Sequence, residues 1–444
     1  MGSTDDADTD VERTHGSFRG RCAMYALISC FEMTNYLTRL AVPYLVAFIV
    51  RDQRFSEAQR AMLLNSFTPG YVLTQIPAGW GIQRWGCKPV IAANGCGIVA
   101  VMLSLPLAAR HGAAAVSACL FAFGVVQSTF APALWTIKAT WIPQGPERAW
   151  ALMASGMGTT LAKNVAAFLT PLLAGRYGWQ SAAATYGGAV GLYTASWLGC
   201  ATERPKTEAN PRGQLLLTPS SQADSSDGDG NVLAKKQHPF SPLQLMRAKP
   251  VLANTFLHMQ HDLSELQILA AWSPTYYNQV LGVPLASVGA FTFWPMLCAL
   301  PAKPVVAAWE TWMLKRGASL RQIRKAAALI ACCVSVPGGL LFAVARRPVL
   351  ATIGYTVFVF GQVFDAAVVA PNKLDLGGTE GDMPVIASWS STAAWSSGLL
   401  CASVLVALKQ WTRSWLPLLL VPLGMCVLPC LCPCSAPVRP LFRY

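Results

Sequence analysis

The residue with the clearest chemistry is an arginine inside an apolar stretch. Arg39 lies in LTRLAVPYLVAF, a sequence suited to membrane depth. A guanidinium there costs several kcal/mol unless it faces a wet cavity or an ionic partner. Its planar set of N–H donors fits carboxylate or phosphate oxygens. We therefore predict that Arg39 binds an anionic substrate. The alternative is a structural ion pair with Glu32, which precedes it on a similar helix face.

A second polar group occurs in HMQHDLSELQILAAW. His258, His261, Asp262 and Glu265 are spaced i, i+3, i+4 and i+7, so they share one helix face. Such a face should line an aqueous cavity, where it could bind a proton near neutral pH or coordinate sodium through its oxygens. We count Glu32 in the same coupling class. The alternatives are hydrogen bonds to neighbouring helices, or a helix that begins later and leaves the group in cytoplasmic water.

Other charged residues inside apolar stretches are weaker candidates. Lys163 and Lys303 would add positive potential for an anion, whereas Lys138, near a helix end, is expected to snorkel to the interface. Tyr71 should face inward with the polar side of its helix and donate to a substrate anion. Asp365 could pair with one of these lysines or with the arginine of the first helix, and it joins the coupling candidates.

Membrane helices must position these residues, because the composition is far from that of a soluble domain. The chain is 53% hydrophobic and 12% charged, and its mean hydropathy is positive. About 20 consecutive apolar residues span a bilayer as a helix. About twelve such runs occur, near residues 22–50, 60–80, 89–109, 114–138, 150–173, 179–200, 251–274, 286–309, 326–345, 348–370, 384–407 and 412–434.

One long polar interruption divides these runs six and six. Residues 201–250 contain TERPKTEANPRG and PSSQADSSDGDGNVLAKKQH, which have few residues that could build a core and so indicate a disordered linker. We therefore predict an all-α polytopic membrane protein with two six-helix bundles. Its predicted parts are an N-terminal tail 1–21, a bundle 22–200, the linker 201–250, a bundle 251–434 and a C-terminal tail 435–444.

The basic residues predict the orientation, since cytoplasmic loops retain positive charge. With the N-terminus inside, most of the 34 lysines and arginines, Lys373 among them, fall in cytoplasmic segments. Both tails and the linker are therefore expected to be cytoplasmic. The formal charge of +13 then requires no nucleic-acid partner. The acidic start MGSTDDADTD has neither a basic n-region nor an apolar h-region, so we predict no signal peptide, and the sequence does not specify the membrane.

The segment YVLTQIPAGWGIQRWGCKPV is expected to end the second helix at the cytoplasmic face. Gly79 allows close approach of another helix, Gly86 permits a tight turn, and Arg84 and Lys88 anchor that turn at the membrane surface. A weaker version of the same motif, AAWETWMLKRGASLRQIRK, follows the eighth run and includes Glu310. The same kind of joint is thus predicted once in each half.

These residues carry a family resemblance. The stretch LLNSFTPGYVLTQIPAGWGIQRWGCKPV resembles the second helix and following loop of the major facilitator superfamily, in its anion:cation symporter branch. That branch includes vesicular glutamate, sialic acid, sodium-phosphate and plastid phosphate carriers. Shorter matches are NYLTRLAVPYL, WTIKATWIPQGPER, WSPTYYNQVLG and NKLDLGG. The resemblance implies the major facilitator fold, an arginine at position 39 for the substrate anion, and a gating loop to which we assign Gly79, Arg84, Gly86, Lys88, Glu147, Arg148 and Glu310.

The chain also departs from the pattern of that branch. Gln83 replaces the acidic residue that usually precedes the loop arginine, so a charge link that helps to govern gating in the family is missing. Leu120 and Gln127 stand where the branch carries an arginine and a glutamate in the fourth helix. In the resemblance that glutamate takes part in proton coupling, so its loss weakens the case for family-type proton symport.

The sequence contains none of the catalytic signatures we sought: no phosphate-binding loop, H-E-x-x-H or G-x-S-x-G. We therefore predict a protein that is not an enzyme and needs no cofactor. It should be a monomeric secondary active transporter of a carboxylate or phosphate, coupled to sodium or protons and working by alternating access in a lipid bilayer. Phosphate, glutamate, sialic acid and ascorbate all suit one arginine in a polar cavity. A channel-like anion path and a transport-inactive sensor or scaffold remain as alternatives.

Overall fold

The computed structural model describes residues 17–143, 147–202, 242–263, 271–376 and 382–431. This part of the chain is helical and contains no β-strand. The helices are α2 (Phe18–Asp52), α3 (Glu57–Trp85), α4 (Cys87–Arg110), α5 (Ala113–Gln127), α6 (Phe130–Trp141), α7 (Glu147–Tyr177), α8 (Trp179–Cys200), α9 (Pro242–Arg247), α10 (Lys249–Asp262), α11 (Ala271–Gln279), α12 (Leu285–Lys315), α13 (Leu320–Val344), α14 (Pro348–Leu376), α15 (Met383–Thr412) and α16 (Leu416–Leu431).

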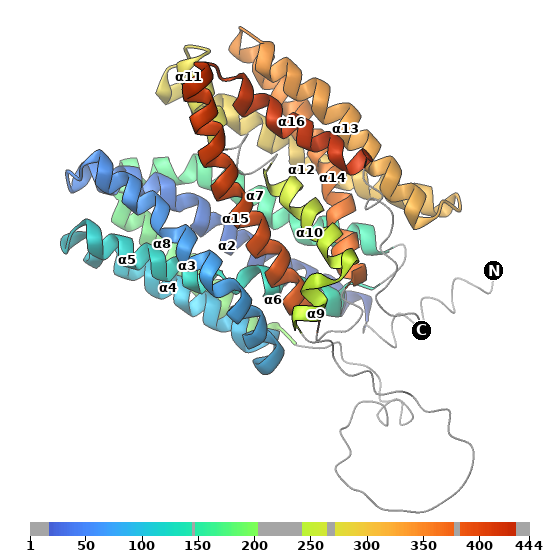
Figure 1. Ribbon diagram of the computed structural model, residues 1–444. Helices are drawn as coiled ribbons and strands as arrows, with labels where there is room; N and C mark the ends of the chain where they lie inside the picture. Colours follow the sequence, from blue (N-terminus) through green and yellow to red (C-terminus); the bar gives the residue numbers. More distant parts are fainter. Residues whose placement is uncertain (1–16, 144–146, 203–241, 264–270, 377–381, 432–444) are drawn as a thin grey trace, which may run out of the picture.

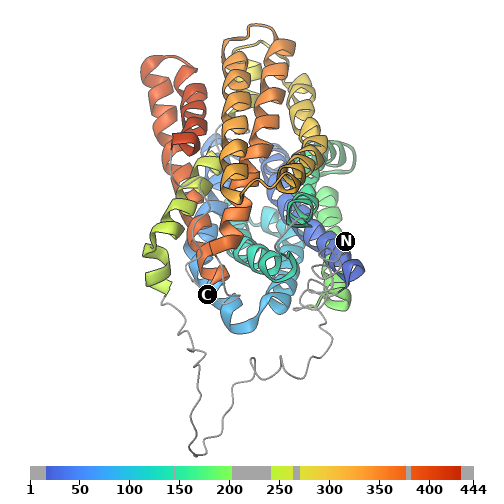
Figure 2. The ribbon, with the colours of Figure 1, turned by 90° about the vertical axis from the view of Figure 1, so that its right-hand side faces the viewer.

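The helices form two groups. In the first half of the chain α2 packs on α7, α3 on α5 and α4 on α8, and in the second half α13 packs on α14 and α16, and α12 on α14. Between the halves, α7 contacts α12, and α15 contacts α3 and α6. Figure 1 shows the two groups meeting near α9 and diverging towards α5 and α11. We call the end where α8 ends and α9 begins the linker side; α2 also begins there (Figure 2).

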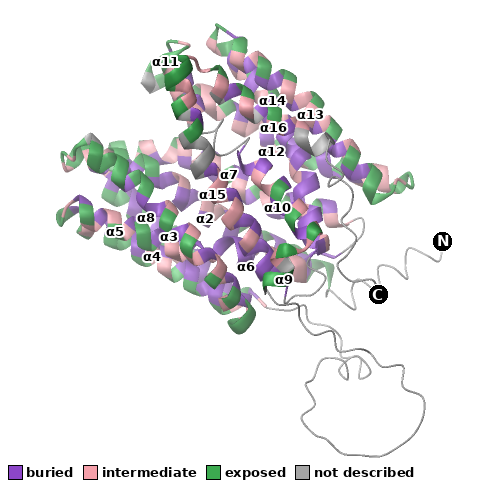
Figure 3. Ribbon diagram, viewed as in Figure 1, coloured by how far each residue is buried: buried purple, intermediate pink, exposed green. Residues whose placement is uncertain are grey.

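The outer surface suits a lipid environment. Six helical stretches among the described residues are long and apolar enough to cross a membrane: Phe18–Asp52, Cys87–Arg110, Ala113–Trp141, Ser287–Lys315, Leu320–Val344 and Pro348–Leu376. Large apolar side chains face outward, such as Leu73, Leu192 and Trp411, which are 69%, 73% and 82% exposed. Exposed residues line the outside of the bundle and buried residues lie between the helices (Figure 3). Apolar side chains on the outside are expected where lipid replaces water.

The fourth apolar run is two helices rather than one. We expected a single helix over 114–138, but α5 ends at Gln127 and α6 begins at Phe130. Pro132 contributes to the break, because proline has no N–H to donate to the carbonyl four residues earlier, and it stands in the first turn of α6, where that N–H would need no partner. The break places Gln127 at the very end of α5, inside the protein.

The seventh run also differs from the prediction over 251–274. It comprises α10 and α11, and the residues between Leu263 and Ala271 lie outside the described part of the chain. Pro250 stands in the first turn of α10, where its missing N–H needs no partner. Residues 242–250, which we assigned to the linker, are helical apart from Ala248 and form α9 and the start of α10.

Candidate substrate-binding site

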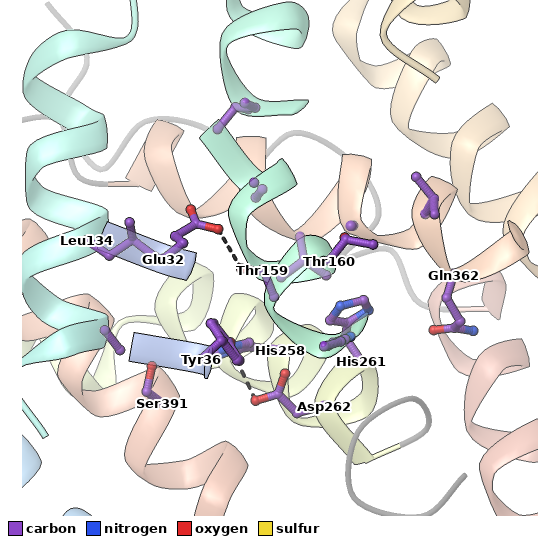
Figure 4. A pocket seen from close by; sticks show the side chains of 18 of the residues that line it. Glu32, Tyr36, Leu134, Thr159, Thr160, His258, His261, Asp262, Gln362 and Ser391 are labelled. Carbon is purple, nitrogen blue, oxygen red and sulfur yellow. Dashed lines mark hydrogen bonds and ion pairs between the residues drawn. The ribbon is translucent and has the colours of Figure 1, made fainter. Parts of the chain in front are cut away.

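A cavity of about 220 Å³ lies between the two halves. Residues of α2, α3, α6 and α7 line one side, and residues of α10, α12, α14 and α15 line the other. Figure 4 shows polar side chains from both halves pointing into it. The positively charged lining residues outnumber the acidic ones: Arg39, Lys138, Lys163 and Lys303 against Glu32 and Asp262. This excess of positive charge favours an anion.

Arg39 lies at this cavity in a cage of aromatic rings. It is 9% exposed, and its guanidinium carbon lies 4.7 Å from the ring centre of Tyr71 and 5.2 Å from that of Trp395. The rings of Tyr36, Phe67 and Phe130 are also within 6 Å. Its Nη2 atom is buried and has no hydrogen-bond partner among the described residues. A buried donor of this kind is costly unless a ligand accepts from it.

Gln127 holds the other end of the guanidinium. Its Oε1 accepts a 2.7 Å hydrogen bond from Arg39 Nε, while its own Nε2 donates to the Asn35 carbonyl at 3.0 Å and to Thr38 Oγ1 at 3.2 Å. Gln127 is fully buried. The sequence marked this residue only as a lost glutamate. In the structure it is a neutral anchor that orients Arg39 without neutralising its charge.

Glu32 has partners other than Arg39. It forms an ion pair with Lys138 of α6 and accepts a 2.6 Å hydrogen bond from Thr159 Oγ1 of α7 (Figure 4). The alternative of a Glu32–Arg39 pair is therefore not what the structure contains. Lys138 is 5% exposed, so the prediction that it snorkels to the interface is also wrong. Glu32 satisfies the buried charge of Lys138 and leaves that of Arg39 uncompensated.

Tyr71 faces inward and is 1% exposed, as its helix position predicts. Its hydroxyl accepts from Gln75 Nε2 at 3.1 Å, and Gln75 Oε1 accepts from Thr392 Oγ1 of α15 at 3.2 Å. This chain of hydrogen bonds links the first half to the second directly beside Arg39. Lys163 lines the same cavity, and Lys303 donates to the Gly156 carbonyl of α7.

The polar face of α10 also reaches the cavity. His258, His261 and Asp262 line it (Figure 4), with His258 Nε2 3.6 Å from Asp262 Oδ2. His261 Nδ1 lies 2.7 Å from Asp365 Oδ2 on α14, so the partner of Asp365 is a histidine rather than the lysine or arginine we expected. Glu265, the fourth member of the predicted face, lies outside the described residues.

Lys373 lies beside the polar face of α10, although we predicted it in a cytoplasmic loop. Its side chain is fully buried in α14, and its Nζ lies 3.2 Å from His258 Nδ1 and 4.6 Å from the ring centre of Trp135 on α6. We counted Lys373 among the cytoplasmic basic residues because the tenth apolar run was predicted to end near residue 370. No local feature of the sequence indicates that α14 continues to Leu376 and places this lysine inside the protein.

The predicted gating residues of α3 lie at the linker side. A Cβ at Gly79 would lie 2.2 Å from Ser388 Oγ and 2.8 Å from the Pro384 carbonyl of α15, so only glycine permits this approach. Gly86 has φ 84° and ψ 171° and joins α3 to α4. Of the two flanking cations, Arg84 is exposed and the carbonyl of Lys88 accepts from Trp197 Nε1 at 3.1 Å.

The remaining gating candidates divide between the halves. Glu147 accepts from Arg21 Nη2 at 2.9 Å and from the Tyr25 hydroxyl at 2.9 Å, both within the first half. Arg148 instead crosses to the second half, where its Nη1 lies 2.6 Å from Asp375 Oδ1.

Asp375 is the centre of a cluster at this end of the molecule. It also pairs with Arg324 of α13, which in turn donates to Asn372. Glu310 is 9% exposed and lies in the electrostatic field of Arg324 and Arg148. Its Oε2 has no hydrogen-bond partner in the described ranges. We call Arg148, Arg324, Asp375 and Glu310 the linker-side charge cluster, and it joins α7 to α12, α13 and α14.

Comparison with known proteins gives a consistent picture. The family model for the Major Facilitator Superfamily matches residues 25–374. The chain is similar to the "Ascorbate transporter, chloroplastic" of Arabidopsis thaliana, at 28% identity over 313 residues, which is 67% of this chain and 53% of the relative. It is also similar to the "Sodium-dependent phosphate transport protein 1, chloroplastic" of the same plant, at 29% identity over 305 residues, 67% of this chain and 56% of the relative.

A third relative is "Probable anion transporter 4, chloroplastic" of Oryza sativa subsp. japonica, at 29% identity over 335 residues, 73% of this chain and 53% of the relative. The chain thus spans about half the length of these curated relatives. Their names are those of transporters and not of enzymes. Among solved structures, the E. coli fucose:proton symporter matches with a TM-score of 0.62 at 12% identity, over 93% of this chain and 98% of that one, which shows the shared fold.

Proposed function

Because the chain belongs to the major facilitator superfamily, we propose that it is a secondary active carrier of a small anion that works by alternating access. The observation that carries this proposal is Arg39, a buried guanidinium with an orphaned Nη2 atom at a cavity between the halves. Gln127 fixes its orientation without cancelling its charge. An oxyanion that accepts from Nη2 would supply the missing partner and the missing negative charge.

The size of the cavity narrows the substrate class. Sites for drug-sized ligands occupy roughly 300–1,000 Å³, and this cavity of about 220 Å³ is smaller. Two of the relatives are named for ascorbate and for phosphate, and both anions are small enough to be the first probes. We assign Arg39 and Tyr71 to the anion itself, with Lys163 adding positive potential from α7.

Alternating access requires that the halves separate at one end while they close at the other. Contacts at the linker side support this: Gly79 against Ser388, and Arg148 with Asp375. An anion bound between Arg39 and the second half would change the free-energy difference between the two arrangements only by its differential affinity for them. We therefore propose that the bound substrate, the hydrogen bonds from Tyr71 through Gln75 to Thr392, and the linker-side charge cluster together couple the movements of the two halves.

The test is uptake into proteoliposomes of labelled phosphate and labelled ascorbate, with wild type and Arg39→Gln compared. Wild type should show saturable uptake of one of the two probes. In Arg39→Gln this saturable uptake should fall by about tenfold or more, because a hydrogen bond to a charged group contributes about 1.5–3 kcal/mol. Arg51→Gln removes an exposed arginine from the same helix and should behave as wild type. Flux that rises linearly with concentration would indicate a channel, and binding without flux would indicate a sensor.

A further inference from the structure

The most unusual buried charge outside the anion site is Lys373. It lies in the last turns of α14 with its side chain fully buried. Its Nζ lies 3.2 Å from His258 Nδ1, and the other ring nitrogen, Nε2, lies 3.6 Å from Asp262 Oδ2. His258 and Asp262 line the cavity. The three side chains therefore form a line from the cavity to a buried amine.

The surroundings of this line come from six helices. On the side of the first half, Tyr36 of α2 and Tyr71 of α3 lie close enough to Asp262 to interact with its charge. α6 contributes Lys138 and the ring of Trp135, the latter 4.6 Å from Lys373 Nζ. On α10 the neighbouring titratable group is His261, whose own partner is Asp365 of α14. α15 contributes the backbone of Ser390, which is hydrogen-bonded to His258. Lys373 thus contacts one imidazole directly, and the charges of Asp262 and Lys138 act on it from nearby.

This arrangement suits a proton better than a metal cation. Sodium would need several oxygen ligands, whereas the centre of this group is an imidazole flanked by an amine that is positively charged when protonated. Lysine changes its protonation state readily when buried, and histidine carries protons on either nitrogen. The ammonium can donate its proton to His258 Nδ1 as the Nε2 proton passes to the Asp262 carboxylate. The products are a neutral amine, a neutral imidazole and a carboxylic acid that faces the cavity.

We propose that Lys373, His258 and Asp262 form a proton-binding site that couples anion movement to a pH gradient rather than to a sodium gradient. This inference rests on the proposed carrier function. This proton-binding site would take over the role that the family resemblance gives to a glutamate at position 127, where this chain has a neutral glutamine.

The position of Lys373 also connects its protonation state to the contacts that hold the halves together at the linker side. The neighbouring residues Asn372 and Asp375 both bind Arg324 of the linker-side charge cluster, and Asp375 binds Arg148 across the halves. The contact of Lys373 with Trp135 also joins α14 to α6. A cation near an aromatic ring is attracted by it, and a neutral amine loses that attraction. Loss of the proton would therefore weaken the closed arrangement of the halves on the linker side.

The experiment compares net accumulation with exchange in proteoliposomes, using labelled phosphate and labelled ascorbate as probes. Wild type should accumulate its probe under an imposed pH gradient without sodium, and a sodium gradient alone should add nothing. Lys373→Met fixes the site neutral and Lys373→Arg fixes it charged, so each should lose at least tenfold of pH-driven accumulation. Counterflow, in which exchange of one bound anion for another needs no net proton release, is measured in both variants to establish whether they still bind and move the anion. Lys315→Met, at an exposed lysine of α12, should retain both activities.

The outcomes separate this inference from the carrier proposal. Absence of any wild-type counterflow for either probe would count against the carrier itself. Wild-type counterflow with accumulation driven only by sodium would overturn the proton site, whatever the variants do. Undiminished pH-driven accumulation in Lys373→Met would overturn it as well. If the lysine variants lack counterflow, His258→Gln replaces them, and pH-driven accumulation at the wild-type level in that variant would contradict the proposal.

Discussion

At the scale of single residues, the central feature is an arginine oriented by a neutral side chain. Arg39 has the aromatic faces of Tyr71 and Trp395 around it and Gln127 on its Nε. Its charge is thus stabilised by quadrupoles and dipoles, which attract a cation without competing with an incoming anion for the ion pair. A carboxylate in place of Gln127 would occupy the guanidinium instead.

Gln127→Glu should therefore weaken substrate binding. The introduced carboxylate would replace an oxygen 2.7 Å from Arg39 Nε, and we expect the half-saturating substrate concentration to rise about tenfold, equivalent to about 1.4 kcal/mol. Concentration-dependent uptake measures this directly. Gln180→Glu, at an exposed position of α8, is the matched control. An unchanged half-saturating concentration in Gln127→Glu would mean that the charge of Arg39 is not what holds the substrate.

At the scale of elements, helix ends and close approaches place the site. The interruption at Pro132 ends α5 at Gln127 and so brings the glutamine to Arg39. The extension of α14 to Leu376 carries Lys373 inward and Asp375 to the charge cluster. The approach of α3 to α15 at Gly79 lets the two halves meet at the linker side.

Gly79→Ala should disturb that approach. The added Cβ would lie 2.2 Å from Ser388 Oγ and 2.8 Å from a backbone carbonyl, which cannot rotate away. Overpacking of this kind costs about 1–3 kcal/mol, so the thermal unfolding midpoint in detergent should fall and the initial uptake rate with it. Gly199→Ala meets no atom within 4 Å in α8 and should leave both unchanged or slightly improved. Equal stability of the two variants would show that α3 and α15 do not need this contact.

Some residues of this site can be predicted from the local sequence, and others depend on how distant helices pack together. Arg39 was identifiable because an intramembrane charge is informative by itself. Pro132, near the division between α5 and α6, is also visible in the sequence, but we predicted one helix because the apolar run is unbroken. The roles of Gln127 and Lys373 depend on how α5 and α14 pack against α2 and α10, and that information is non-local. The sequence therefore predicted the helical fold and the presence of charges within apolar stretches better than it predicted the partners of those charges.

At the scale of the whole molecule, the protein consists of two helix groups (Figure 1). They meet at a polar cavity and are joined by an ion pair at the linker side. Arg148 of the first half and Arg324 of the second share one carboxylate, Asp375. One acidic residue therefore joins α7 to α13 through α14. The free-energy difference between the closed and separated arrangements of this end should depend strongly on it.

Asp375→Asn should favour separation of the halves at the linker side. Loss of charge-assisted hydrogen bonds shifts the equilibrium by about 1.5–3 kcal/mol, which corresponds to roughly tenfold or more in the separated population. Backbone hydrogen exchange in the first turns of α7 and the last turns of α14 should increase accordingly. Asp52→Asn, an exposed acid at the other end of α2, is the control. Exchange in those turns that matches wild type would contradict a gating role for the cluster.

Counterflow distinguishes a carrier from a channel or a sensor, because only a carrier exchanges an anion held at one site between two halves. Proteoliposomes preloaded with excess unlabelled ascorbate or phosphate receive a trace of the same labelled anion outside. We predict a transient accumulation of label above the outside concentration in wild type, which is lost in Arg39→Gln and retained in Arg51→Gln. Label that only equilibrates in wild type, or an overshoot that survives in Arg39→Gln, would contradict it.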